Sequence, residues 1–293
     1  MATETVTAPD PTDAPDLDAL RDRQQRVWSS GDYTKIAALT VPVSETLVAE
    51  AEIPPGGRVL DVATGTGHAA LAAARQGARA SGLDYVPGLL GVARARAAAE
   101  RLALDLVDGA AEHLPYPDGS FDVVLSAIGV MFSADHERAA AELVRVTTPG
   151  GRIALAAWTP GGFVGGMLAT VGRHVPPPPA ARSPLRWGTT EHVADLLGTG
   201  VTDVRSTVHS LTLRFPDAAT FADLFLAYYG PAYSAAATLS PEGRTALRAD
   251  LIAHAVASAR PHTPGDHLVL DWEYLVVTAE RTRGREPGAQ ASG

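Results

Sequence analysis

The sequence predicts an α/β fold in which helices cover both faces of a mostly parallel sheet. Short apolar runs alternate with helical segments between Arg58 and Trp158, and continuous apolar runs are typical of parallel strands that are buried on both faces. The first run, Arg58–Val62, breaks into a loop that contains Gly65 and Gly67, and an alanine-rich helix follows at once. Strand, glycine turn and helix in this order form the first unit of a doubly wound α/β fold.

The same alternation gives the other elements in order. After the first strand we expect strands at 78–83, 104–107, 121–126, 152–158, 204–215 and 267–280. We expect helices at 68–75, 89–101, 137–146, 191–197, 221–229 and 244–260, and two more before Pro54. The predicted organisation is a disordered N-terminus (1–17), an N-terminal helical lid (18–57), a core (58–158), a cap with the remaining strands (159–280) and a disordered tail (281–293).

Composition and charge exclude several functional classes. The chain of 293 residues carries a net charge of -9, which argues against a nucleic-acid partner because such binding needs a basic surface. There is no cysteine, hence no thiolate metal site or cysteine nucleophile, and no H-E-x-x-H motif or Asp/His cluster suggests a metal. No signal peptide or membrane-spanning segment is evident, so we expect a cytoplasmic protein without a membrane partner. A homodimer is compatible with the sequence.

The glycine loop and the acid before it indicate the class of ligand. Glycine lets the backbone approach a ligand closely, and the amides at the start of the next helix are unpaired donors. The stretch Gly65–Ala70 satisfies the dinucleotide-binding pattern G-x-G-x-x-G/A only formally, because Asp61 lies in the strand just before the loop and gives D-x-x-x-G-x-G. This form resembles motif I of the class I S-adenosylmethionine (SAM)-dependent methyltransferases of the ubiquinone/menaquinone-biosynthesis type.

The resemblance implies a Rossmann-like, doubly wound, seven-stranded sheet, mostly parallel with an antiparallel last strand, and a helical cap insertion. It implies SAM as cofactor and S-adenosylhomocysteine (SAH) as product. The segment 108–126 is similar to motifs II and III of that family, and E-L-x-R-V-x-x-P-G-G before the fifth strand is a further similarity. The cofactor-binding residues that we infer are Tyr33, Asp61, Ala63, Thr64, Gly65, Gly67, Asp84, Ala110, Ala111, Glu112 and Ser126.

Three of these residues need separate comment. Asp84 ends the second strand, where a carboxylate can accept both ribose hydroxyls; the alternative is a solvated loop carboxylate. Tyr33 lies in the segment expected over the cofactor, or else packs the N-terminal helices onto the sheet. Ala110 stands where the family has an aspartate that recognises the adenine amino group. Losing that charge-assisted hydrogen bond costs on the order of 1.5–3 kcal/mol, although backbone amides or Asp108 could substitute.

Methyl transfer from a sulfonium is a one-step displacement that depends on alignment, and a histidine is the simplest base at neutral pH. By position, His136 is the best candidate, the alternative being a residue with local hydrogen bonds at a helix start. Aromatic and apolar side chains that could line an acceptor pocket, or belong to the core, are Met131, Phe132, Trp158, Trp187, Tyr228 and Tyr229.

The function predicted from these observations is SAM-dependent methylation of a small, fairly apolar metabolite, at oxygen rather than carbon or nitrogen. One alternative is a protein that keeps the fold but binds SAM weakly or uses it without methyl transfer, as Ala110 suggests. Another is an NAD-dependent oxidoreductase, which would need no Asp61 and for which no Tyr/Lys or His catalytic set is found.

Overall fold

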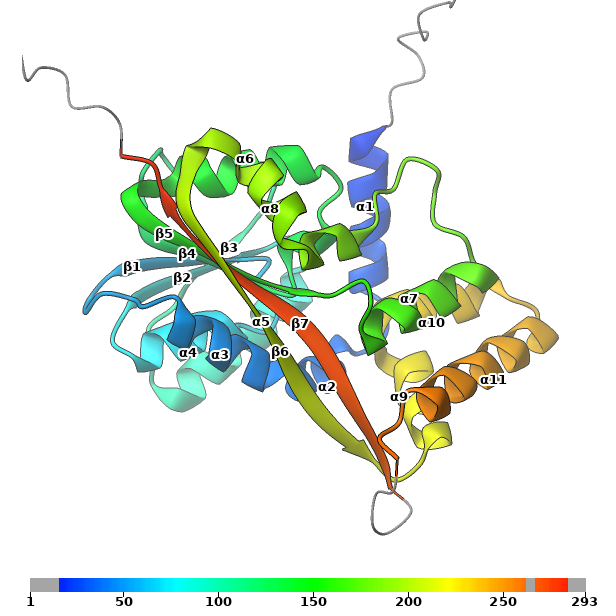
Figure 1. Cartoon of the computed structure of the whole chain (residues 1–293). Coiled ribbons are helices and arrows are strands. Elements are labelled where there is room, and N and C mark those ends of the chain that lie inside the picture. The colour runs from blue at the N-terminus through cyan, green and yellow to red at the C-terminus, as the bar shows by residue number, and fades with distance from the viewer. Residues whose placement is uncertain (1–15, 262–266, 284–293) are drawn as a thin grey trace, which may run out of the picture.

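A computed structural model describes residues 16–261 and 267–283. Its centre is a seven-stranded sheet of order β3-β2-β1-β4-β5-β7-β6 (Figure 1). The strands are β1 (Arg58–Val62), β2 (Arg79–Asp84), β3 (Asp105–Asp108), β4 (Phe121–Ala127), β5 (Thr147–Trp158), β6 (Val201–Phe215) and β7 (Leu268–Arg281). β1 to β5 run parallel, while β7 pairs antiparallel with both β5 and β6. The predicted fold class is confirmed.

The strand order determines where a ligand-binding crevice can form. From β1 the chain winds outward through β2 to β3, then returns to place β4 on the other side of β1. β1 and β4 are therefore neighbours whose connections leave in opposite directions, and ligands of open α/β sheets bind in the crevice at that point. Val59, Leu60 and Val62 are fully buried, as expected for a strand covered on both faces.

Helices cover both faces of the sheet (Figure 1). α3 (Val41–Glu50) and α4 (His68–Arg75) pack together on one face, and α6 (His136–Val146) and α8 (Thr190–Leu197) pack together on the other. α5 (Pro87–Glu100) packs against β2 and β3. In the described part of the chain no helix is both long and apolar enough to cross a membrane.

A second group of helices lies near the end of β6 and the start of β7 (Figure 1). It consists of α7 (Phe163–His174), α9 (Ala218–Tyr228), α10 (Gly230–Thr238) and α11 (Pro241–Ala257), and α1 (Leu17–Trp28) packs against α10 (Figure 1). Because α9, α10 and α11 connect β6 to β7, they form the helical insertion expected from the sequence. We call α7 and α9–α11 the cap.

The structure differs from the sequence-based expectation in several elements. α2 (Tyr33–Ala37) and α10 were not expected, because α2 follows Gly31 closely and α10 begins at Gly230, and glycine usually marks the end of a helix. β5 begins at Thr147 rather than 152, where Thr147 pairs with Phe121 before an irregularity in the ladder. Leu17 already belongs to α1, whose start is capped by the Asp16 side chain, and Arg281 ends β7. The rest of the two predicted disordered ends, 1–15 and 284–293, lies outside the described residues.

Candidate functional site

A cleft opens at the carboxyl ends of β1, β2 and β4. It covers about 640 Å³ of space not filled by protein atoms, including open solvent at its mouth. Two smaller recesses adjoin it, one towards β3 and one towards the cap, and Phe132 lines all three spaces. The main cleft is lined by Trp28, Tyr33, Ala37, Thr40, Ser44, Asp61, Ala63, Thr64, Gly65, Thr66, His68, Ala69, Asp84, Tyr85, Leu89, Ala127, Ile128, Gly129 and Phe132.

The glycine loop forms one wall of the cleft. Gly65 has φ +54°, and a Cβ built there would meet no protein atom within 4 Å, so the space in front of this residue is open. At Gly129, after β4, there is no room for a side chain, because a Cβ would lie 2.7 Å from the carbonyl oxygen of Ala63. The loops after β1 and β4 thus touch, and the cleft begins where they meet. Ala63 and Ile128 take the left-handed conformation (φ +55° and +54°), which is strained for a β-branched residue such as isoleucine.

Asp61 lines this cleft with a carboxyl group that is only partly hydrogen-bonded. Its side chain is 1% exposed, and Oδ2 accepts hydrogen bonds from Thr64 Oγ1 (2.6 Å) and the Ala70 amide (3.0 Å). Oδ1 is buried and has no partner within the described chain. Burial raises the pKa of Asp61 to about 7, because the ionised form lacks sufficient compensation. A buried carboxylate oxygen in this state fits a cationic ligand group, such as the ammonium of SAM.

Asp84 is held in a fixed orientation by the backbone. Oδ2 accepts from the Gly65 amide and Oδ1 from the Val86 amide, both at 2.8 Å. Burial, with a smaller effect of Asp108, raises the pKa of Asp84 to about 6. Each carboxylate oxygen keeps a further lone pair, so the group can accept a vicinal diol at the cleft. This geometry fits the ribose that the family resemblance implies.

The recess towards β3, which we call the polar recess, is small and opens from the main cleft beside Asp84. Ala111 and Glu112 line it together with Asp84 and Tyr85, whereas Ala110 lies outside the lining. Ser126 does not face either space: it is fully buried, donates to the Val62 carbonyl (2.7 Å) and accepts from the Val130 amide (2.8 Å). The complete lining is Ala63, Leu83, Asp84, Tyr85, Gly109, Ala111, Glu112, Gly129, Val130, Phe132 and Ser133.

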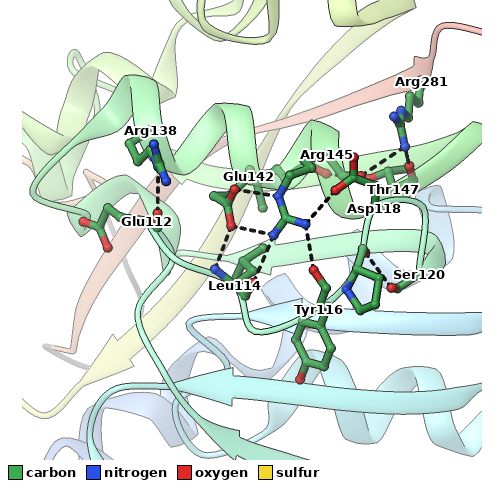
Figure 2. A network of polar contacts seen from close by, with 12 residues as sticks. Glu112, Leu114, Tyr116, Asp118, Ser120, Arg138, Glu142, Arg145, Thr147 and Arg281 are labelled. Carbon is green, nitrogen blue, oxygen red and sulfur yellow. Dashed lines mark hydrogen bonds and ion pairs between the residues drawn. The ribbon is translucent and has the colours of Figure 1, made fainter.

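A charged network fixes the loop that carries this recess (Figure 2). Arg145 on α6 makes a two-point ion pair with Glu142, with both N–O distances 2.7 Å. The same guanidinium donates to the carbonyls of Tyr116 (2.7 Å) and Leu114 (3.0 Å), and Glu142 accepts from the Leu114 amide (2.8 Å). Bidentate arginine–carboxylate pairs have strict geometry, so the loop between β3 and β4 is held rigidly against α6.

The recess towards the cap, which we call the aromatic recess, is narrow and shares Trp28, Tyr33 and Phe132 with the main cleft. Trp28 lies at its mouth and packs edge-on against Tyr33, Phe132 and Tyr229 at ring-centroid distances of 5.1, 4.8 and 5.8 Å. Burial raises the pKa of Tyr33 to about 12 and also raises the pKa of Tyr229, so both phenols stay protonated. The lining is Trp28, Tyr33, Ile36, Thr40, Ile128, Phe132, Trp158, Val164, Met167, Phe225, Tyr229 and Trp272.

The structure therefore brings some predicted acceptor-site residues together and leaves others apart. Phe132, Trp158 and Tyr229 line the aromatic recess, but Met131, Trp187 and Tyr228 do not. Met131 and Trp187 are fully buried core side chains. Their apolar character suggested a pocket, yet the sequence could not tell which buried face would be hollow.

His136 lies away from the cleft. It is the first residue of α6, is completely buried, and packs edge-on against Trp187 (5.6 Å) and His192 (6.1 Å). Burial lowers the pKa of His136 to about 4, and the residue lines neither the main cleft nor its two recesses. His136 therefore does not lie at the position expected of a base that acts near the methyl group.

Sequence reasoning missed several lining residues. Tyr85 follows Asp84 directly and Ile128 follows β4, so position at the carboxyl end of a strand could have revealed both. His68 starts α4 at the cleft, and burial and the nearby Arg96 lower its pKa to about 4. Phe225 and Trp272 come from the cap and from β7, and no local signal marks them. Among the described residues there is no cluster of three or more side chains suited to a metal ion.

Comparison with known proteins identifies related sequences and folds. Residues 60–155 match a family described as "Methyltransferase domain". An uncharacterised protein of Mycobacterium tuberculosis (strain H37Rv) is 41% identical over 273 residues, which cover 92% of this chain and 98% of that protein. A demethylmenaquinone methyltransferase of Deinococcus radiodurans is 42% identical over 124 residues, which cover 41% of this chain and 52% of that enzyme.

A similar fold occurs in the YcgJ protein of Bacillus subtilis, with a TM-score of 0.56 and 18% identity over 83% of this chain and 99% of that one. At this identity the likeness concerns the fold.

Proposed function

We propose that this chain, which belongs to the class I SAM-dependent methyltransferases, binds SAM in the main cleft and methylates a hydroxyl oxygen of a small, apolar acceptor in the aromatic recess. The observation that carries the proposal is the pair Asp61 and Asp84. Two buried carboxylates at one cleft, each with a raised pKa, match a ligand that has both a cationic and a diol group.

Three features of the main cleft support the binding of SAM. Asp61 Oδ1, which lacks a partner within the described chain, would accept the ammonium, and Asp84 would accept the ribose hydroxyls. The open space in front of Gly65 leaves room for the ligand to pass along the loop. Burial of both carboxylates strengthens such charge-assisted hydrogen bonds.

The fit to an apolar acceptor rests on the aromatic recess. Rings from α1, α2, β5, α9 and β7 surround it, and among the described residues that line it none has a carboxylate, an imidazole or a basic side chain. A polar or charged acceptor would be desolvated there without compensation, whereas a flat apolar molecule would bury its surface against the rings. Hydroxyl and indole groups of the lining residues remain to orient one oxygen.

The reaction follows from this arrangement as a direct in-line displacement. SAM would supply an electrophilic methyl group, and the C–S bonding pair would stay with sulfur in SAH. The acceptor oxygen, having lost its proton to solvent before it enters the recess, would take the methyl group. The chain contributes alignment of acceptor and cleft and exclusion of water by Trp28 and Phe132. Because no base lines the recess, an acidic hydroxyl, as in a phenol or an enol, is the best acceptor.

Two measurements test the proposal. Calorimetric titration of SAM and SAH, with NAD as control, should give binding of both SAM and SAH but not of NAD, and Asp84→Ala should weaken the binding by roughly 100-fold. Incubation with methyl-labelled SAM and matched pairs of phenols and anilines should label the phenols. Absence of SAH binding would overturn the cofactor assignment, and labelling of anilines alone would overturn the choice of oxygen.

A further inference from the structure

The polar recess holds two side-chain oxygens, a carboxylate acceptor and a hydroxyl that can donate, which have no partner within the described chain. Glu112 Oε2 and Ser133 Oγ are both buried, lack a hydrogen-bond partner within the described chain, and belong to side chains 4% and 7% exposed. Both residues line the recess next to Asp84. Buried polar groups in native structures are nearly always paired, so two orphan oxygens in one recess point to a ligand that supplies the partners.

The Glu112 carboxylate is fixed in place. Its Oε1 accepts from the Ala134 amide at 2.7 Å, the residue next to Ser133, so the carboxylate lies against the segment that carries the serine. Arg138 Nε donates to the Glu112 backbone carbonyl at 3.2 Å, and Figure 2 shows this bond from α6. With one oxygen held, Oε2 is pre-organised rather than free to turn towards water.

We infer that Glu112 and Ser133 recognise the amine-bearing edge of the adenine ring, in place of the aspartate that Ala110 replaces. This inference rests on the proposed function. Beyond the ribose held by Asp84, the base is the part of the ligand left to occupy the adjoining recess. The exocyclic amine donates to the carboxylate, and the serine hydroxyl pairs with the neighbouring edge position, which satisfies both orphan oxygens.

Measuring base preference tests this pairing without using catalytic turnover. SAH and S-inosylhomocysteine differ only at the base, where a keto oxygen replaces the amine and the ring nitrogen beside it becomes a donor. For the unmodified protein we expect calorimetry to give an affinity for SAH at least tenfold above that for the inosine analogue, because the analogue would place an oxygen against the carboxylate.

Two substitutions then separate the roles. In Glu112→Gln the amide oxygen can still accept from Ala134 while the NH₂ faces the recess, so the preference for SAH should fall at least tenfold or reverse. Ser133→Ala should reduce the preference by a smaller factor. Asp84→Asn serves as control: it should weaken both ligands alike and leave their ratio unchanged. Thermal unfolding checks that each variant is folded.

The outcomes are distinguishable from those of the proposed function. If the unmodified protein binds no SAH, the cofactor assignment fails. If it binds SAH without preferring it over the inosine analogue, or if Glu112→Gln and Ser133→Ala both keep the full preference, the inference about the base fails while the cofactor assignment stands.

Discussion

The polar recess and the aromatic recess open from the same cleft, yet they are built in opposite ways. The polar recess is lined in part by a loop that Glu142 and Arg145 hold in place, and it contains two buried oxygens without a partner in the described chain. The aromatic recess is formed by rings from elements far apart in the chain and offers shape and apolar surface. Directional hydrogen bonds select one ligand strictly, whereas apolar contact discriminates weakly. Under the proposed function, the side that binds the methyl donor would be strict and the side that binds the acceptor would be tolerant.

Removing Asp84 should produce the largest effect and only on the donor side. Asp84→Ala removes the acceptor of two ribose hydroxyls and leaves the Gly65 and Val86 amides unpaired, so SAH affinity should fall by roughly 100-fold. Calorimetry measures this loss, and Trp158→Phe in the aromatic recess is the matched control. Equal loss in both variants would contradict the separation of the two recesses.

A change of pH should affect the donor side through Asp61. Its raised pKa of about 7 means that the folded protein favours the protonated carboxyl, so the free energy of unfolding without ligand should fall as pH rises from about 4 to about 7. A cationic ligand instead favours the ionised carboxyl and must displace the proton below pH 7. SAH affinity should therefore rise roughly tenfold between pH 5.5 and 7 and then level off.

Calorimetry at several pH values, in buffers with different ionisation enthalpies, measures both the affinity and the proton released. Asp61→Asn should lose this step and keep only a smaller one near pH 6 from Asp84, whose pKa is about 6. A flat profile for the unmodified protein would be inconsistent with an unpaired Asp61 at the cleft.

Narrowing the aromatic recess tests the tolerant side. Val164→Phe adds a ring to an aliphatic part of the lining, which should reduce kcat/KM for bulky phenols by roughly tenfold, a typical loss for an overfilled apolar pocket. SAH affinity should remain within twofold because this residue does not line the main cleft. Steady-state kinetics with small and bulky phenols, beside SAH titration, decides the outcome; a shift in SAH affinity would show that the recesses are not independent.

The smallest expected effect concerns Ala110. If Glu112 and Ser133 already satisfy the base, Ala110→Asp should raise SAH affinity by less than about threefold, since a second acceptor adds little once the donors are paired. The same substitution in a Glu112→Gln background should restore most of the lost preference for SAH over the inosine analogue. A gain of tenfold or more in the otherwise unmodified protein would indicate that the amine is unrecognised there.

The contrast between the recesses also explains what the sequence could predict. Asp61, Gly65 and Asp84 lie at strand ends whose spacing is local, so their meeting at one cleft followed from the βα pattern. Ser126 lies on β4, one of the strands that border the cleft, but its side chain points to the β1 backbone. The direction of a side chain near the end of a strand depends on the loop that follows, which the strand pattern does not predict.

The aromatic recess could not be predicted from local sequence patterns. Trp272 packs edge-on against both Trp158 and Phe225, and these rings come from β7, β5 and α9, a tertiary arrangement without a local signal. The prediction that His136 lies near the methyl group failed for the same reason. The surroundings of His136 are formed by Trp187 and His192, which lie more than fifty residues further along the chain.

Phe132 borders the main cleft and both recesses, so under the proposed function it would contact both the methyl donor and the acceptor. A designer who wishes to broaden the range of acceptors should therefore leave this ring untouched and work from the far wall, at Val164 or Phe225. A change at the shared wall would alter two affinities at once, and an apparent gain in substrate range could be a hidden loss of cofactor.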